Sequence, residues 1–253
     1  MKKFNLCHFS QQLATVGAIG VMAVAALIPA TAFAASNSGT KCAKGDTKCV
    51  ITVGDTLIAN RQTSLNTLNG KISSDLSAHK ITQDQASALQ ADVSTNESGL
   101  SSLKTKLDAE TSTTAARIDV ANIFLQFRIY VVVLPRDYRM IEMDVELNAK
   151  GVMQNVAPEI QAAINGAPAD KQEQLKQLFS DYQAQVSNAE SQIDTAQADF
   201  PGMTPENYNQ NKTAYEANHK ALDTALKNAS QDLHQAAKDL HQMANIMGLP
   251  ASH

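Results

Sequence analysis

The stretch TQDQASALQADVSTNESGLSSLKTKL, residues 82–107, decides the fold class of this chain. Its apolar positions follow one another in alternating steps of three and four residues, which places them along one face of an α-helix. Thr82 and Gln85 have the spacing of a capping box, in which each side chain bonds the backbone N–H of the other residue at the helix start. The sequence therefore predicts a helix with one narrow seam, formed by Ala86, Leu89, Val93, Asn96, Leu100, Leu103 and Leu107.

Asn96 is the one polar residue in this seam. A lone Asn in a coiled-coil seam usually fixes the register of the helices at some cost in stability. The sequence leaves open whether the seams close within one chain. Unpaired seams would instead require a homodimer, and Asn96 would then set its register.

Other segments carry the same spacing. Residues 50–53 are β-prone, and Asp55 follows as the expected cap of a helix whose seam runs from Ile58 to Leu76, with Arg61 in one apolar position. Apolar seams also run through 149–164, 175–196 and 208–247. Pro158 is expected to kink or restart the first of these helices, Gly166 to end it, and Thr204-Pro205 to open the last, which is the longest.

Helices with narrow seams and short connections pack as antiparallel hairpins. The predicted fold is all-α, an elongated, coiled-coil-like bundle of such hairpins. The expected organisation is a signal peptide at 1–34, a flexible lead-in with a disulfide loop at 35–54, a helical hairpin at 55–122, an apolar connection at 123–138, further hairpins at 139–248 and a tail at 249–253.

Residues 1–34 have the features of a secretory signal. Lys2 and Lys3 precede an uncharged run at 13–28, and Ala32-Phe33-Ala34 has the small residues of a cleavage site. An uncleaved anchor is the alternative, but a spanning helix needs about 20 apolar residues. We therefore expect an exported bacterial protein, secreted, periplasmic or at the cell surface, with no membrane span after cleavage.

The net charge and the cysteines exclude some classes of function. The formal net charge of −4 disfavours a nucleic-acid binder, which needs a basic face. In an exported chain, Cys42 and Cys49 are expected to form a disulfide. A metal or redox pair is the alternative, but their spacing fits neither a metal-ligand pattern nor the redox C-x-x-C motif.

The central run IFLQFRIYVVVLPRDY, residues 123–138, differs from the rest of the chain. Its β-branched residues, and the proline after Leu134, favour an extended strand that could pair with residues 50–53. A buried helical turn is the alternative. The run is either core, where the hairpins meet, or an interaction patch for a partner. The candidate patch residues are Phe124, Phe127, Tyr130, Val132, Leu134 and Tyr138.

Motifs that carry chemistry are missing from the sequence. There is no P-loop, G-x-G-x-x-G or G-x-S-x-G motif. His234 and His241 are two helical turns apart, too far to share one metal without another helix. His219 lies in a seam near Lys212 and Tyr215, where it is either a pH-sensitive contact or solvated at a loose helix end. We predict no catalytic residue, metal site or cofactor, and no enzyme activity.

Three pieces, at 50–72, 81–93 and 127–137, resemble secreted bacterial coiled-coil proteins of uncharacterised function. This resemblance covers about a fifth of the chain and implies an exported helical protein, with no activity or catalytic residue. Residues 81–85 also partly resemble the L-T-x-x-Q motif of small periplasmic stress-response chaperones. They depart from it in having Ile for Leu and in occurring once, and a capping box explains the same residues.

Two functions follow as expectations. The first is a non-enzymatic structural or interaction protein, a helical spacer or scaffold at or outside the cell surface, which binds a protein partner or itself. The second is a periplasmic chaperone-like or ligand-binding module that uses the apolar segment at 123–138.

Overall fold

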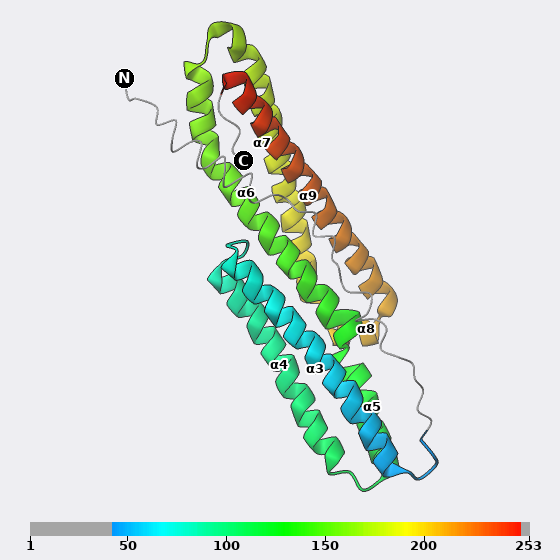
Figure 1. Ribbon diagram of the computed structural model, residues 1–253. Helices are drawn as coiled ribbons and strands as arrows, with labels where there is room; N and C mark the ends of the chain where they lie inside the picture. Colours follow the sequence, from blue (N-terminus) through cyan, green and yellow to red (C-terminus); the bar gives the residue numbers. More distant parts are fainter. Residues whose placement is uncertain (1–41, 249–253) are drawn as a thin grey trace. The chain divides into compact units, whose positions relative to one another are not determined.

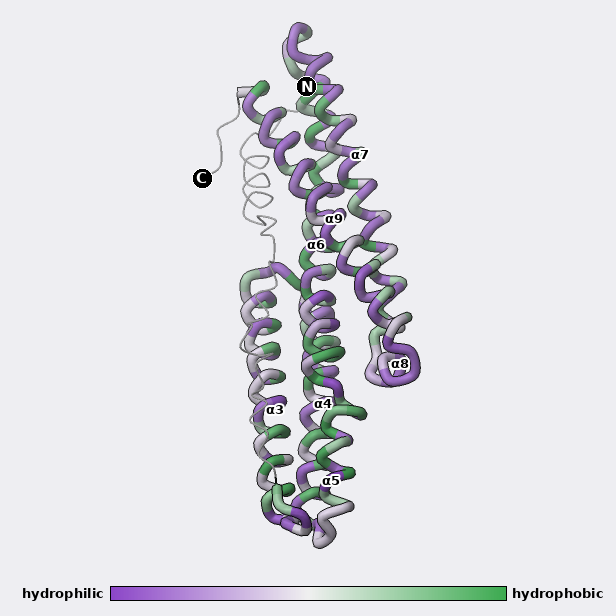
Figure 2. Tube along the Cα trace, turned by 90° about the vertical axis from the view of Figure 1, so that its right-hand side faces the viewer, coloured by the Kyte–Doolittle hydropathy of each residue, from purple (hydrophilic) through white to green (hydrophobic). Residues whose placement is uncertain are grey.

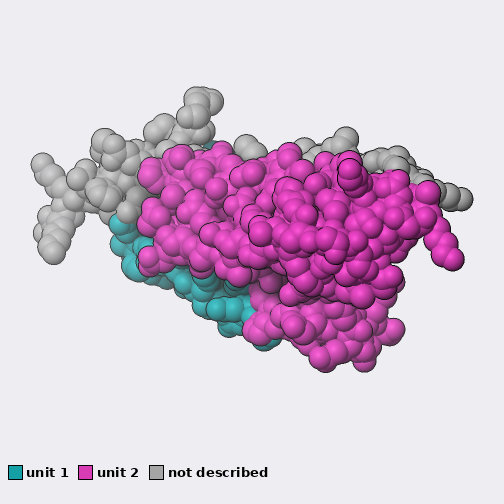
Figure 3. Space-filling model, turned by 90° about the horizontal axis from the view of Figure 1, so that it is seen from below, with its two compact units in different colours: residues 1–25, 142–198, 220–253 teal, residues 26–141, 199–219 magenta. Residues whose placement is uncertain are grey.

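A computed structural model describes residues 42–248, and within this range the chain forms helices and contains no strand. The all-α prediction is thus confirmed. The predicted signal peptide and the tail at 249–253 lie outside the described residues. The described chain divides into two compact units (Figure 3). Unit 1 holds residues 142–198 and 220–248, and unit 2 holds residues 42–141 and 199–219.

Unit 2 is built on an antiparallel hairpin of two long helices, α3 (Thr47–Ser77) and α4 (Gln83–Asp108) (Figure 1). The predicted capping box opens α4, with Gln85 N–H donating to Thr82 Oγ1 over 3.3 Å and Thr82 N–H to Gln85 Oε1 over 2.7 Å. The predicted seam of α4 faces the core, where these residues are buried: Ala86, Leu89, Val93, Leu100, Leu103 and Leu107.

A third helix, α5 (Thr113–Asn122), packs beside this hairpin. The hydroxyls of Thr47 and Thr113 hydrogen-bond over 2.7 Å and tie the starts of α3 and α5 together. Gly54 makes the close packing possible, because a Cβ there would lie 2.3 Å from Leu107 and 2.9 Å from Val120. Part of the core of unit 2 therefore lies between these three helices.

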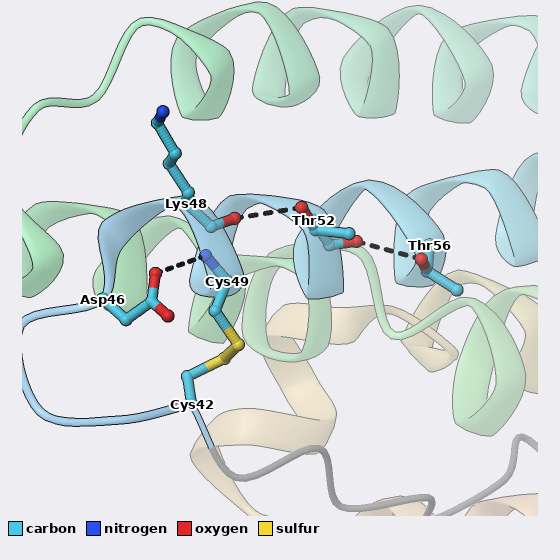
Figure 4. The surroundings of a disulfide bond; sticks show 6 residues. All are labelled: Cys42, Asp46, Lys48, Cys49, Thr52 and Thr56. Atoms are coloured by element: carbon cyan, nitrogen blue, oxygen red, sulfur yellow. Dashed lines mark hydrogen bonds between the residues drawn. A yellow bond between two sulfur atoms is a disulfide. The ribbon is translucent and has the colours of Figure 1, made fainter.

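The expectation that residues 50–53 are extended and that Asp55 caps the first helix is wrong. Helix α3 begins at Thr47, and its cap is Asp46, whose carboxylate accepts from the Cys49 N–H over 3.0 Å (Figure 4). β-Branched residues are only slightly unfavourable in a helix, so capping and the burial of Val50 outweigh their preference. Asp55 instead pairs with Lys104 of α4 at 2.7 Å.

The predicted disulfide joins Cys42 to Cys49, in the first turn of α3 (Figure 4). We expect the double variant Cys42→Ser/Cys49→Ser to lose about 2 kcal/mol of unfolding free energy, because the bond restricts the unfolded chain over a short loop. Denaturant titration of the oxidised wild type and the variant measures this difference. The wild type under reducing conditions should match the variant, and equal stability of all three samples would contradict the prediction.

The strand expected at the centre is also wrong. Two π-helical turns, η1 (Ile123–Phe127) and η2 (Ile129–Val133), lead into α6 (Leu134–Gly166). Arg128 separates the turns with a left-handed backbone at φ 44°. A strand needs a partner, and the only candidate, at 50–53, is helical, so the backbone bonds are made locally. Leu134 is helical despite the proline that follows it, at φ −60° and ψ −49°.

Unit 1 is formed by α6 from residue 142, α7 (Ala169–Asp199) up to residue 198, and α9 (Lys212–Met247) from residue 220. Pro158 lies inside α6, which continues to Gly166 without restarting. The predicted seams supply buried residues from each helix, among them Ala149, Val156, Ile160, Ile164, Leu175, Tyr182, Val186, Ile193, Leu222, Leu226, Leu233 and Leu240.

Polar bonds between helices fix the packing of unit 1. The buried Tyr182 hydroxyl donates to the Met153 carbonyl over 2.6 Å. Lys171 Nζ donates to the Ile246 carbonyl over 2.7 Å, which joins the start of α7 to the end of α9. Helices α7 and α9 are therefore antiparallel.

The last helix does not run unbroken through 205–247 as predicted. After a 3-10 turn, η3 (Phe200–Gly202), the short helix α8 (Pro205–Gln210) ends at Asn211, and α9 begins at Lys212. Thr204 caps α8 as expected, accepting from the Asn207 N–H over 3.2 Å. Asn211 accepts from the Ala214 N–H over 3.0 Å and so caps a new helix where the sequence pattern shows continuity.

Candidate functional site

The six candidate patch residues are divided between the surface and the core of unit 2. The exposed member is Phe124. Phe127, Tyr130 and Tyr138 are half-buried, whereas Val132 and Leu134 are buried. The central segment thus has one side in the core and another in contact with solvent.

The large apolar side chains that are exposed in the described residues all belong to α5 and the π-helical turns. Ile118 is 57% exposed, Leu125 50%, Val131 45% and Phe124 43%. We call these four residues the apolar face. Figure 2 shows α5 and the adjoining turns as one of the more hydrophobic parts of the trace. The sequence analysis selected Phe124 but missed the other three residues. Ile118 and Leu125 are seven residues apart, a spacing that places them on one side of a helix and could have identified them.

The same stretch is apolar in composition. By length and composition alone, the helical path Thr113–Gly166 passes the test for a membrane-crossing helix, and 39% of its most apolar window is buried in the protein. Core helices of soluble proteins pass the same test. The buried part of this segment includes Ile123, Ile129 and Val133, which belong to the core of unit 2.

Arg61 of α3 lies beneath one member of the apolar face, Phe124. Its guanidinium carbon is 4.7 Å from the centre of the Phe124 ring and 4.9 Å from that of Tyr130, which are cation–π distances. Nη1 donates to the Leu57 carbonyl over 2.9 Å. The residue is only 3% exposed, and this burial lowers the pKa of the guanidinium.

Helix α8 holds the π-helical turns in place. Asn209 accepts from Arg128 Nε over 2.6 Å and donates to the Leu125 carbonyl over 2.6 Å. The guanidinium of Arg128 also lies 4.4 Å from the ring centre of Tyr208. These contacts stabilise the left-handed backbone of Arg128, which costs free energy for a residue with a Cβ.

We expect Asn209→Ala to loosen the π-helical turns, since it removes both side-chain bonds. The predicted loss of unfolding free energy is about 1 kcal/mol, because the bonds are partly exposed. Hydrogen exchange should accelerate at the amides of 129–133, while α4 keeps its protection. Gln210→Ala, an exposed position on the same helix, is the matched control. Unchanged exchange in Asn209→Ala would mean that α8 does not hold the turns.

A cluster of charged side chains lies at the C-terminal end of the central segment. Arg136 pairs with Asp92 of α4 and, through Nε at 2.8 Å, with Asp137. Asp137 is fully buried and its Oδ2 has no hydrogen-bond partner among the described residues. Burial raises the pKa of this carboxyl to about 7, with Asp92 adding to the rise and Arg136 opposing it.

Asn96, predicted to fix a helix register, bonds within α4. Its amide donates to the Asp92 carbonyl over 2.9 Å and to Asp92 Oδ2 over 3.1 Å. The side chain is half-buried. Asn96 thereby orients the carboxylate that pairs with Arg136, a role that seam position alone does not indicate.

The predicted cluster around His219 consists mainly of ring contacts. The ring centre of Tyr215 lies 5.1 Å from that of Tyr208 and 6.3 Å from that of His219. Tyr215 is buried, and this burial raises the pKa of its hydroxyl to about 12. Lys212 is exposed and pairs with Glu216 at 3.4 Å. His234 and His241 are exposed on α9, in unit 1. Residues 42–248 contain no group of three or more His, Cys, Asp or Glu that could hold a metal.

No family model, curated protein or solved structure matches this chain. The apolar face, the arginine beneath it and the bonds that hold the π-helical turns are therefore the observations from which a function can be argued.

Proposed function

We propose that this chain is an exported, non-enzymatic interaction protein, a helical scaffold that binds a partner through its apolar face. The observation that carries the proposal is the concentration of exposed apolar side chains at Ile118, Phe124, Leu125 and Val131. Exposed apolar patches on soluble proteins commonly mark interaction sites. Export itself is inferred from the sequence of residues 1–34, and the disulfide suits an oxidising compartment.

The way in which the segment is held supports the same proposal. Strained backbone and π-helical turns occur preferentially at functional sites. Here a left-handed Arg128 and two π-helical turns present the apolar side chains, and Asn209 bonds both Arg128 and Leu125. A binding surface that is already ordered loses less conformational entropy when a partner docks.

Binding of a neutral hydrophobic dye tests this proposal. The wild-type protein should increase the fluorescence of N-phenylnaphthylamine, and Ile118→Ser/Leu125→Ser should reduce the increase severalfold. Ala88→Ser/Ala91→Ser, at exposed positions of α4, is the control and should bind as the wild type does. Equal dye binding by all three proteins would overturn the proposal, provided that circular dichroism shows each to be folded.

A chaperone-like or ligand-binding module is the second candidate, favoured by the buried cation beside the apolar face. A chaperone should suppress the aggregation of an unfolded client, and the Ile118→Ser/Leu125→Ser variant should lose that effect. A scaffold with a specific partner would leave client aggregation unchanged.

A further inference from the structure

The charge of Arg61 is not paired with a carboxylate in the described part of the chain. The only hydrogen bond that its guanidinium makes there is with the Leu57 carbonyl, and Nε is buried without a partner. Burying an unpaired charge is costly, and buried charges in proteins are normally paired. Stacking on two aromatic rings offsets only part of this cost. Arg61 therefore has unused capacity to bind an anion.

This capacity lies beside apolar surface. Phe124 is the link, because its ring stacks on the guanidinium of Arg61 and is also 43% exposed. The next residue, Leu125, is 50% exposed, and Ile118 lies two helical turns before it on the same path. A cation and an apolar surface are thus adjacent in unit 2, separated by one aromatic ring that reaches solvent.

We propose that Arg61 and the apolar face together bind an amphipathic anion, a fatty acid whose carboxylate pairs with the guanidinium and whose acyl chain covers Leu125 and Ile118. The inference rests on the proposed function, because it uses the same apolar face. The carboxylate can accept from Nε and the neighbouring terminal nitrogen, the bidentate geometry that a guanidinium favours. Access of the carboxylate to these donors requires the Phe124 side chain, which is 43% exposed, to rotate off the guanidinium, and exposed side chains change rotamer rapidly.

Helix stability does not require a charge at this position. Replacing a buried ion by an apolar side chain of similar length is often neutral or stabilising. The Leu57 carbonyl keeps its place in the backbone ladder of α3 without the side-chain bond. We therefore expect Arg61→Met to fold and to unfold at the wild-type temperature or above, which makes it a usable probe of binding.

The experiment compares decanoate with decanol, which share a chain and differ in the charge of the headgroup. Calorimetric titration of the full chain should show the acid binding about tenfold more tightly than the alcohol, as expected for a charge-assisted hydrogen bond. Arg61→Met should remove this preference and leave decanol binding unchanged. Arg61→Lys, which keeps a charge without the planar fork, should retain part of it. Leu125→Ser should weaken both ligands alike.

The outcomes separate this inference from the proposed function. Equal affinity of the wild type for acid and alcohol, with both weakened by Leu125→Ser, would overturn the inference and leave the apolar face as a binding surface. An acid preference that persists in Arg61→Met would also overturn it. Binding to anionic phospholipid vesicles without binding of monomeric decanoate would replace the fatty acid by a membrane surface. Equal dye binding by the wild type, Ile118→Ser/Leu125→Ser and the α4 control, measured separately, would instead overturn the proposed function.

Discussion

Replacing Gly54 by alanine should lower the unfolding free energy of unit 2 by about 2 kcal/mol, the size of effect seen when a well-packed core is overfilled. The added Cβ would lie 2.3 Å from Leu107 Cδ2 and 2.9 Å from Val120 Cγ2, closer than carbon atoms approach. Leu107 is fully buried and cannot turn into solvent. The side chains of Leu107 and Val120 must therefore shift within a filled core, which strains the contact of α4 and α5 with α3.

Gly70 provides a matched control on the same helix. A Cβ at Gly70 would meet no atom within 4 Å, and the residue is exposed. Gly70→Ala should raise the unfolding free energy by about 1 kcal/mol, because alanine is the better helix former. Denaturant titration followed by circular dichroism measures both variants. A stabilised Gly54→Ala would show that the α3, α4 and α5 contact is looser than the structure indicates.

Stability should fall as pH rises from about 4 to about 7, owing to Asp137. The pKa of this carboxyl rises from 3.8 to about 7 in the folded chain, chiefly because it is buried. Between these values the folded state binds more protons than the unfolded state, so deprotonation favours unfolding. The loss is on the order of 4 kcal/mol at full ionisation, from about 1.4 kcal/mol per pKa unit, and it levels off above pH 7.

Asp137→Asn tests the source of this pH dependence. The variant has no titrating group at the position, and Arg136 keeps its pairing with Asp92. Its unfolding free energy should therefore vary less with pH than that of the wild type, so the two curves diverge between pH 4 and 7. Thermal melts across this range give both curves. An unchanged slope in Asp137→Asn would assign the pH dependence to another group.

The helical seams could be predicted from the sequence, because burial on one side of a helix determines which positions are apolar. A helix that packs on one side must place apolar residues three and four apart, so Leu89, Val93 and Leu100 could be assigned to the core before the structure was known. The capping box at Thr82 and Gln85 could be read for a similar reason, since the bonds that it makes are local.

The extended segments were mispredicted because β-propensity depends on a partner. Val50 and its neighbours favour a strand only where another strand can pair with them, and nothing local shows whether one will. The central valines lack such a partner and form π-helical turns, in which the N–H groups of Val131, Val132 and Val133 all point to the Arg128 carbonyl. The helix break at Asn211 could not be predicted either, because the three-and-four spacing of the apolar seam continues across it.

The candidate site was only partly visible in the sequence. The central segment stands out by composition, and Arg61 stands out as a cation in an apolar seam. The central segment and Arg61 meet because α5 packs along α3. This packing brings the rings of Phe124 and Tyr130 onto the guanidinium of Arg61. Contacts between residues sixty or more positions apart, like that of Arg128 with Asn209, leave no mark in local spacing.

The two π-helical turns set which side of α6 faces the core, relative to the buried side of α5. A π-turn takes in one residue more than an α-turn, and one residue rotates everything downstream by about 100° around the axis. Deleting one residue from Ile123–Phe127 would therefore turn the buried side of the first turns of α6, with Asp137 and Ile141, away from the core of unit 2. A change of one residue in length should therefore destabilise the protein more here than in the loops between its helices.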